Sequence, residues 1–231
     1  MQTTFTLINM QTIDVFALCF NEEVILPSFI KHYKEMGAQI TIYDNGSTDS
    51  SRDIIIQNEC KFIPYESNGK IRDDIYTNIK NNCWKNSKAD WVIVCDTDEF
   101  IKVDFDYSKY TIINTKGYDM IGTPDSNIGV PNDWYSKHIM FKPKSIKEIN
   151  YTIGAHRCSP TGKVIGSKEI APLLHYKYIS EEYTYQRHLL YQSRLSDINK
   201  HYGWGKEYEQ AEKELIKQQY DKLKSESLVV F

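Results

Sequence analysis

The feature that most constrains the fold is an alternation of short apolar runs and longer amphipathic segments between residues 13 and 96. The apolar runs have the length of strands, and the segments between them carry apolar residues at helical spacing. Runs at 13–20, 39–44, 61–65 and 91–96 predict strands, and segments at 21–37, 50–60 and 69–90 predict helices. This order favours an α/β fold with a doubly wound, mostly parallel sheet, whose ligands bind beyond the carboxyl ends of the strands.

The pattern is looser after residue 101. Segments 118–123 and 138–143 predict two further strands around a loop rich in Gly, Pro, Asn and Asp, and the chain is charged and helical from residue 181 until HYGWG interrupts it at 201–205. A length of 231 residues with 41% hydrophobic residues fits one domain. We expect residues 181–231 to form a helical C-terminal extension of that domain.

Charge and cysteine content exclude several classes of protein. The formal net charge of −3 gives no general attraction to nucleic acid or to an anionic membrane. The five cysteines form no Cys-x-x-Cys pair, which argues against a disulfide framework or a zinc site and favours a reducing compartment, so we expect a cytoplasmic protein. No apolar stretch approaches the roughly 18–20 residues of a transmembrane segment.

Three acids follow the most apolar of these runs, in the sequence WVIVCDTDEF at 91–100. If this stretch stays extended, Asp96 and Asp98 point to the same side, while Thr97 and Glu99 point to the other. Two carboxylates in one small space repel each other unless a cation neutralises them, and Mg²⁺ or Mn²⁺ accepts oxygen ligands while leaving positions open for substrate phosphates. The alternative is that Thr97 or Asp98 caps a helix and that the other acids are solvated turn residues.

Polar residues also follow the first two predicted strands. Asn21 and Glu22 begin NEE, and Asp44 begins DNGSTD. Each stretch has a structural interpretation, because NEE suits the start of a helix and Asp-Asn-Gly-Ser is ordinary turn chemistry in which Asp49 caps the following helix. In a doubly wound sheet, however, these strand ends converge on one crevice with Asp96 and Asp98.

The stretch CFNEEVILPSFIKHYKEMGAQITIYDNGSTDSS, followed by DWVIVCDTDEF, resembles family-2-type glycosyltransferases with the GT-A fold, most closely the subgroup with a DxDEF stretch. The resemblance is strong over residues 13–102 and weaker through 141–146, 154–158 and 173–183. It implies a nucleotide-sugar-binding half at 13–102, an acceptor half at 103–180, and an enzyme that inverts the anomeric centre.

The resemblance also implies roles for individual residues. Asp44 matches the acid that contacts the base or ribose, and Asn21 with Glu22 matches the segment along the nucleoside. Arg72 and Asp73 match a basic and acidic pair that contacts the donor. Asp96 and Asp98 match the metal-binding pair, Asp96 lying against the donor as well, and His175 matches a late histidine that reaches the metal or the diphosphate. From the residues alone, His175 in APLLHYKY is equally well a core histidine.

The general base is not assigned by a motif, because the Glu-Asp pair that supplies it in many inverting relatives is absent from this chain. Asp125 is the first candidate, since it follows a predicted strand. His156 in GAHRC is either a packed loop histidine or a group on the acceptor or phosphate side. Glu181, Glu182 and Asp133 are further alternatives.

The sequence therefore predicts a metal-dependent glycosyltransferase that uses Mn²⁺ or Mg²⁺ and a nucleoside-diphosphate sugar. Its partner is a glycan, glycoprotein or lipid-linked acceptor, and no nucleic acid. One alternative is a sugar nucleotidyltransferase, although the Gly-rich basic loop expected after its first strand is replaced here by NEEVILP. The other is a non-catalytic module that binds nucleotide sugars.

Overall fold

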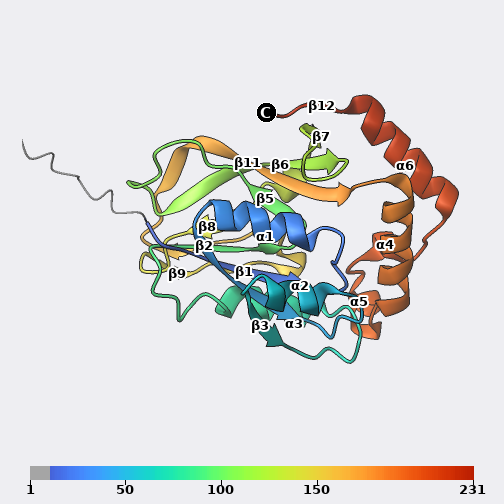
Figure 1. Ribbon diagram of the computed structural model, residues 1–231, viewed down its shortest axis with the longest axis horizontal. Coiled ribbons are helices and arrows are strands. Elements are labelled where there is room, and N and C mark those ends of the chain that lie inside the picture. The colour runs from blue at the N-terminus through green and yellow to red at the C-terminus, as the bar shows by residue number, and fades with distance from the viewer. Residues whose placement is uncertain (1–10) are drawn as a thin grey trace, which may run out of the picture.

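The N-terminal half forms a parallel sheet in a computed structural model that describes residues 11–231 (Figure 1). Residues 1–10, which the predicted domain includes, lie outside the described residues. The strands lie in the order β4-β1-β2-β3 and all run parallel. Their bounds are β1 Ile13–Cys19, β2 Ala38–Asp44, β3 Lys61–Pro64 and β4 Trp91–Asp96.

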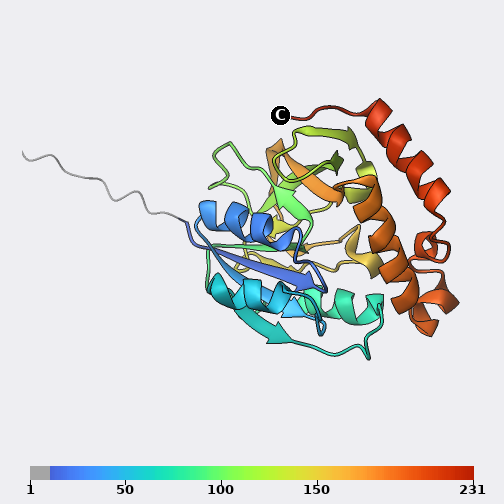
Figure 2. The same ribbon diagram turned by 45° about the vertical axis from the view of Figure 1, so that its right-hand side comes forward.

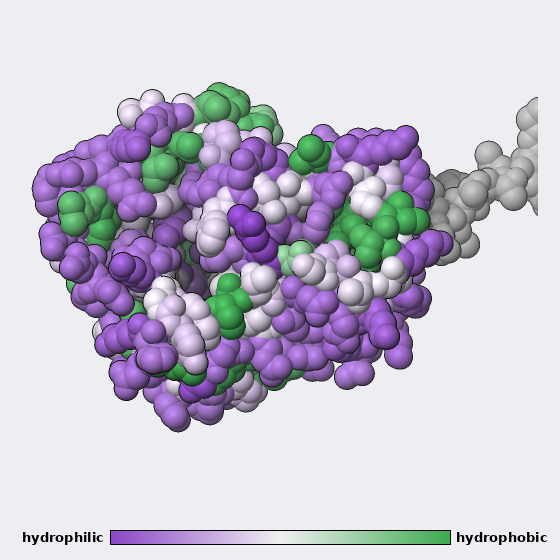
Figure 3. All heavy atoms as spheres, turned by 180° about the vertical axis from the view of Figure 1, so that it is seen from behind, coloured by the Kyte–Doolittle hydropathy of each residue, from purple (hydrophilic) through white to green (hydrophobic). Residues whose placement is uncertain are grey.

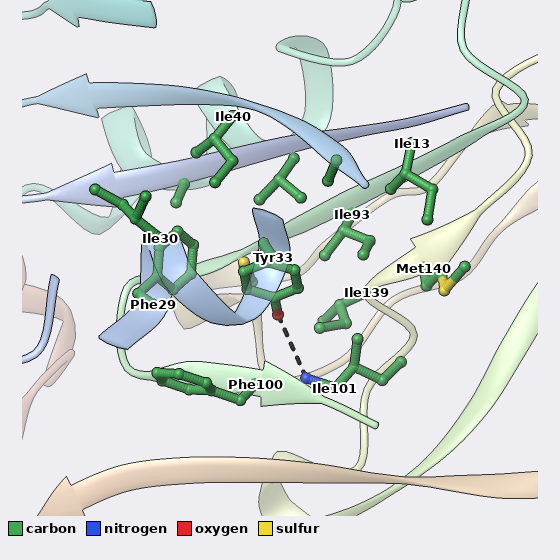
Figure 4. Packing of buried hydrophobic residues seen from close by; sticks show 14 of the residues in the cluster. Ile13, Phe29, Ile30, Tyr33, Ile40, Ile93, Phe100, Ile101, Ile139 and Met140 are labelled. Carbon is green, nitrogen blue, oxygen red and sulfur yellow. Dashed lines mark hydrogen bonds between the residues drawn. The ribbon is translucent and has the colours of Figure 1, made fainter. Parts of the chain in front are cut away.

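Helices cover both faces of this sheet, as a doubly wound fold requires. They are α1 Leu26–Glu35, α2 Ser51–Gln57 and α3 Asp73–Asn82. Side chains from α1 and α2 pack on one face in the larger core, shown in Figure 4, where the Tyr33 hydroxyl accepts a hydrogen bond from the Ile101 amide at 3.3 Å. Trp84, just after α3, packs in a second core on the other face. The predicted fold class is confirmed.

The apolar run of β4 is continuous because both of its faces are buried. Trp91, Ile93 and Cys95 point into the core that contains α1, whereas Val92 and Val94 point into the core that contains Trp84. This double burial positions the acids that follow the strand at its carboxyl end.

Two predicted helices begin later than their patterns indicate. Helix α1 begins at Leu26 rather than near residue 21, because Asn21 adopts a φ of 52° in a turn. Helix α3 begins at Asp73 rather than residue 69, because Asn68 and Gly69 have positive φ and Ile71 forms a bridge with Leu195. The residues just before α1 and α3 therefore lie outside the helices and are available to line a site.

The second half extends the sheet with antiparallel pairs. Strand β8 (Met140–Phe141) lies beside β4, and β6 (Ile112–Ile121) follows it and pairs with β7 (Ile128–Pro131). A 13-residue strand, β11 (Gly166–Tyr178), runs parallel to β6 and pairs with β5 (Glu99–Ile101), the strand that follows the acids of β4. Strands β9 (Ile146–Glu148) and β10 (Thr161–Gly162) form a separate pair.

Residues 181–231 contain three helices. They are α4 Glu181–Arg194, α5 Asp197–Tyr202 and α6 Lys213–Glu226. Helix α4 ends where Leu195 takes a ψ of 120°, and the Ser196 side chain then caps α5. Short 3-10 turns lie at Asp133–Tyr135 (η1), Ile153–Ala155 (η2) and Lys206–Tyr208 (η3), and β12 (Leu228–Val229) pairs with β7.

Helices α4 and α6 lie side by side at one edge of the molecule (Figure 2), joined by a Lys213–Glu182 ion pair at 2.9 Å. In that view the dark blue arrow of β1 points toward the orange helices, so the carboxyl ends of the parallel strands face the extension. Figure 3 shows the molecule from behind the view of Figure 1, and this face of the surface is largely hydrophilic, with small separate hydrophobic patches. Across residues 11–231, none of the helices has both the length and the apolar character needed to cross a membrane.

Candidate active site

A cavity of about 220 Å³ lies between the carboxyl ends of β1 and β4 and the C-terminal extension. One side, here called the acidic wall, carries Glu22, Asp73, Asp96 and Asp98. The facing side, here called the C-terminal wall, carries Lys177, Arg187, His188 and Arg194. Ligands of doubly wound sheets bind at such a position.

Asp96 ends β4 and is held by two buried lysines. Its Oδ2 lies 2.6 Å from Lys80 Nζ and 3.9 Å from Lys137 Nζ. Glu99 fixes this arrangement, because it accepts a hydrogen bond from the Asp96 amide at 3.1 Å and pairs with Lys137 at 2.7 Å. Burial by itself raises the pKa of Asp96, but Lys80 and Lys137 outweigh it and lower that pKa overall. Asp96 therefore carries its charge into the cavity.

Asp98 and His175 lie next to each other at the cavity. Asp98 is in the turn between β4 and β5, and His175 is on β11. The Nε2 of His175 lies 3.4 Å from Asp98 Oδ2, and its Nδ1 lies 3.2 Å from Asp119 Oδ1. Burial lowers the pKa of His175, but the two carboxylates outweigh it and raise that pKa to about 10. Burial conversely raises the pKa of Asp98, and the neighbouring His175 outweighs it, so the net shift is downward. The core and site interpretations of His175 meet here, since the ring is buried and also lines the cavity.

The donor set fits a divalent ion that takes part of its ligands from a substrate. Asp98 Oδ1 is buried and has no hydrogen-bond partner among the described residues, although buried carboxylate oxygens are normally satisfied. Within residues 11–231, no three His, Cys, Asp or Glu side chains are arranged to hold a metal ion by themselves. A site of one or two carboxylates completed by phosphate and water oxygens is the usual pattern for Mg²⁺.

Glu22 lies in the turn after β1 and joins the two walls. Its Oε1 lies 2.7 Å from Arg187 Nη1 on α4, and its Oε2 is buried without a partner among the described residues. Burial raises the pKa of Glu22 to about 7, against the opposing effect of Arg187. Its backbone carbonyl also accepts hydrogen bonds from the Ile25 and Leu26 amides, but α1 has Ile25 as its N-cap, with no side-chain cap and no acid in its first turn, so the capping role predicted for NEE is not found.

Asn21 and Asp44 do not line the cavity. Asn21 Oδ1 accepts a hydrogen bond from the Thr48 amide at 2.8 Å, and Asp44 Oδ2 accepts hydrogen bonds from the Gly46 and Ser47 amides at 3.0 Å each. Both side chains thus shape the 44–49 loop, as the turn interpretation predicts.

The predicted pair Arg72 and Asp73 is divided between two surroundings. Arg72 is outside the cavity lining and forms an ion pair with Asp74 at 2.6 Å. Asp73 lines the cavity, and its Oδ2 accepts a hydrogen bond from Asn199 Nδ2 at 3.0 Å. Burial raises the pKa of Asp73 to about 6. Asn199, on α5, therefore fixes an acid of the N-terminal half.

Of the two predicted catalytic residues, His156 lines the cavity and Asp125 does not. Burial lowers the pKa of His156 to about 3, and its Nδ1 is buried without a partner among the described residues. Asp125 is exposed on the loop after β6. The other candidates are held in ion pairs, Asp133 with Lys116, Glu181 with Lys217 and Glu182 with Lys213.

Sequence reasoning missed the C-terminal wall and the lysines around Asp96. The sequence feature that indicates the C-terminal wall is a spacing on α4 that places four side chains on one helical face. They are Arg187, His188, Tyr191 and Arg194. Nothing in the local sequence marked Lys80 or Lys137, because their partners Asp96 and Glu99 are distant in the sequence.

The model of the family described as glycosyl transferase family 2 matches residues 14–169. The chain belongs to that family. Its mostly parallel sheet with helices on both faces is the GT-A fold. Among curated protein sequences, a search finds no significant match.

The solved structures to which this chain is similar are distant in sequence. S. aureus TarS (residues 1–349) is 12% identical, with a TM-score of 0.44, 80% of this chain and 65% of that chain covered. TarS in complex with UDP-GlcNAc is also 12% identical, with a TM-score of 0.43 and 79% and 66% covered. Glucosyl-3-phosphoglycerate synthase from Mycobacterium tuberculosis, in complex with Mg²⁺ and UDP, is 18% identical with a TM-score of 0.30, 39% of this chain covered and 34% of that chain. In this comparison, the present chain covers about a third of the length of the synthase.

Proposed function

We propose that this family 2 glycosyltransferase moves a sugar from a nucleoside-diphosphate sugar to an acceptor hydroxyl, depends on Mn²⁺ or Mg²⁺, inverts the anomeric centre and belongs to the DxDEF subgroup. The observation that carries the proposal is the meeting of Asp98, His175 and Asp96 in one cavity, with a buried Asp98 oxygen that lacks a partner among the described residues. A cation and a phosphate supply what this oxygen and the facing basic side chains lack.

In this proposal, the chain is one catalytic domain in which residues 13–102 bind the donor. Glu22, Asp73 and Asp96 contact it directly from the acidic wall, while Asn21 and Asp44 act by fixing the 44–49 loop. Arg72 contacts the donor only if its pair with Asp74 opens, since the guanidinium is outside the lining.

Asp96, Asp98 and His175 would hold the divalent ion, which would supply a Lewis acid for the departing diphosphate. His175, whose pKa is lowered by burial but raised overall to about 10 by Asp98 and Asp119, would release its Nε2 proton when the ion binds, because only a neutral imidazole is a metal ligand. Lys80 and Lys137 keep Asp96 ionised and oriented toward the cavity. His175 in turn is oriented by Asp119, a carboxylate behind its other ring nitrogen, which is a usual arrangement for a metal-ligating histidine.

Residues 103–180 bind the acceptor and His156 takes its proton. In a single displacement, the acceptor oxygen bonds to the anomeric carbon, the bond to the diphosphate oxygen breaks, and the hydroxyl proton passes to the base. The depressed pKa of His156 keeps its ring unprotonated at neutral pH. Asp125, the alternative base, is supported only by its place on the loop after β6.

The acceptor class is a glycan, a glycoprotein or a lipid-linked sugar, and nucleic acid is not a partner at a net charge of −3. All five thiols are unpaired, which supports a reducing compartment such as the cytoplasm.

The test is a thermal-shift screen of UDP-, GDP-, CDP- and ADP-sugars with and without Mn²⁺. We expect one class to stabilise the protein, by about 2.7 kcal/mol at 100 times its Kd, and only when Mn²⁺ is present. Product analysis with that donor follows, by proton NMR of the first-formed linkage. Equal stabilisation in EDTA would contradict metal dependence. An α-linked product from an α-linked donor would contradict inversion, and release of pyrophosphate would instead indicate a nucleotidyltransferase.

A further inference from the structure

The C-terminal wall contains a cation that the acidic wall does not neutralise. Lys177 lies two residues beyond His175 on β11, and both side chains line the cavity. Among the described residues, no carboxylate lies within 4 Å of Lys177 Nζ. Its surroundings are aromatic, with Nζ 5.2 Å from the centre of the Tyr208 ring and 5.9 Å from that of Tyr178.

His188 on α4 shows a second, independent deficit. The residue is 5% exposed and lines the cavity, yet both ring nitrogens are buried without a hydrogen-bond partner among the described residues. Its ring packs edge-on against Tyr208 at 5.1 Å, the same ring that Lys177 approaches. A buried ring with two unsatisfied nitrogens costs free energy unless a ligand supplies the missing atoms.

The two arginines of this wall are engaged with the N-terminal half. Arg187 pairs with Glu22 at 2.7 Å. Arg194 donates from Nε to the Gly69 carbonyl at 2.9 Å and lies over the Phe20 ring, while its Nη2 is buried without a partner among the described residues. Lys177 and His188 are thus the positions where an additional oxyanion gains an unneutralised ammonium group and a ring N–H donor together.

The location favours the acceptor over the donor. Lys177 has Tyr135, Tyr178 and Tyr208 as neighbours, and His188 packs against the same Tyr208 ring. None of these tyrosines comes from residues 13–102. The donor diphosphate, on the function proposed above, lies against Asp96 and Asp98 on the opposite wall.

We propose that Lys177 and His188 form a binding subsite for an anionic group, a phosphate or a carboxylate, carried by the acceptor. The inference rests on the proposed function for the statement that the donor occupies the acidic wall. The substrate class is then an acidic acceptor rather than a neutral glycan.

The experiment uses the full chain saturated with Mg²⁺ and the nucleoside diphosphate found in the screen above. Inorganic phosphate is the probe, titrated by calorimetry into the wild type, Lys177→Met and Lys168→Met. Lys168 is the matched control, since it lies on the same strand but is exposed outside the cavity. His188→Phe keeps the aromatic volume without ring nitrogens and serves as a second variant if Lys177→Met does not fold.

We expect phosphate to bind the nucleotide-loaded wild type and Lys168→Met equally, and at least tenfold more weakly to Lys177→Met or His188→Phe. Equal affinity in all variants, or no binding to the loaded wild type, would overturn the acceptor subsite while nucleotide binding leaves the proposed function standing. Phosphate that binds only without nucleotide would also overturn it, because the cations would then serve the donor diphosphate. Failure of every nucleoside diphosphate to bind would instead reject the proposed function itself.

Discussion

The two walls of the cavity differ in how their polar groups are satisfied. On the acidic wall, Asp96 has Lys80 within hydrogen-bond distance and Asp73 has Asn199, so most charges already have protein partners. On the C-terminal wall, Lys177 has no carboxylate neighbour and both nitrogens of His188 lack partners among the described residues. The carboxylates of the first wall are each held by a protein partner, although Glu22 Oε2 and Asp98 Oδ1 lack one, whereas Lys177 and His188 of the second wall have no such partner within residues 11–231 for their charge or ring nitrogens.

This difference separates preorganisation from recognition. Fixed charges are suited to stabilising the same diphosphate in every turnover, because they need no rearrangement when charge develops. Unsatisfied groups discriminate among ligands, because a ligand that lacks the matching atom leaves them unpaired.

The largest effect is expected from Asp98→Asn. The change removes a charge that binds the divalent ion, a contribution of several kcal/mol, so turnover should fall at least about 1000-fold. Circular dichroism should show an unchanged fold, and the exposed Asp104→Asn should retain full activity as the matched control. Normal turnover by Asp98→Asn would show that the acidic wall does not act through this residue.

A smaller effect is expected from Asp44→Ala, which removes the hydrogen bonds to the Gly46 and Ser47 amides. Free-nucleotide affinity should weaken by roughly 1.5–3 kcal/mol, the range for hydrogen bonds to a charged group, because the loop is no longer fixed. Calorimetry measures this, with the exposed Asp53→Ala as control. If Asp44→Ala binds the free nucleotide as tightly as the wild type, the 44–49 loop is not part of the donor site.

Asp73 gives a pH-dependent test of the preorganised wall. Its pKa is raised by burial to about 6 in the folded protein from an ordinary 3.8, so protonation favours the folded state. The stability that this provides is complete below about pH 4 and is lost as pH rises through about 6. Relative to Asp73→Asn, the melting temperature of the wild type should therefore fall across this interval. A constant difference between the two would mean that Asp73 is solvated.

The smallest effect is expected from Asp125→Asn, since the side chain is exposed and outside the cavity lining. With His156 as the base, kcat should change less than threefold in Asp125→Asn and fall by at least roughly 100-fold in His156→Ala, the typical contribution of a general base. If kcat instead falls more in Asp125→Asn than in His156→Ala, Asp125 on the loop after β6 is the general base.

The same contrast explains what the sequence predicts. Strands β1 to β4 have apolar periodicity that is set by local burial, so their order and the convergence of Glu22, Asp96 and Asp98 follow from the pattern. Strand β11 was missed, because Pro172 and the polar cavity-lining His175 and Lys177 interrupt the apolar pattern of its 13 residues. The strand is divided between the core, which contains Ala171, Leu173 and Leu174, and the cavity, which His175 and Lys177 line.

Partnerships across the chain are not readable from one sequence. Glu22 and Arg187 pair from positions 165 residues apart, and Asp73 meets Asn199 from 126 residues away. From the sequence, Arg187 and His188 are therefore expected to be surface residues of a charged helix, although the fold buries His188 and leaves the Arg187 side chain only 11% exposed.

The most direct test of the account measures Mn²⁺ binding by electron paramagnetic resonance, with and without the nucleoside diphosphate. For the wild type, we predict that the signal of free Mn²⁺ decreases strongly only when the nucleotide is present, because Asp96, Asp98 and the diphosphate hold the ion together. Asp98→Asn should abolish that decrease, and Asp104→Asn should preserve it. A wild type that leaves free Mn²⁺ unchanged with the nucleotide bound, or an Asp98→Asn variant that binds it equally well, would contradict the account.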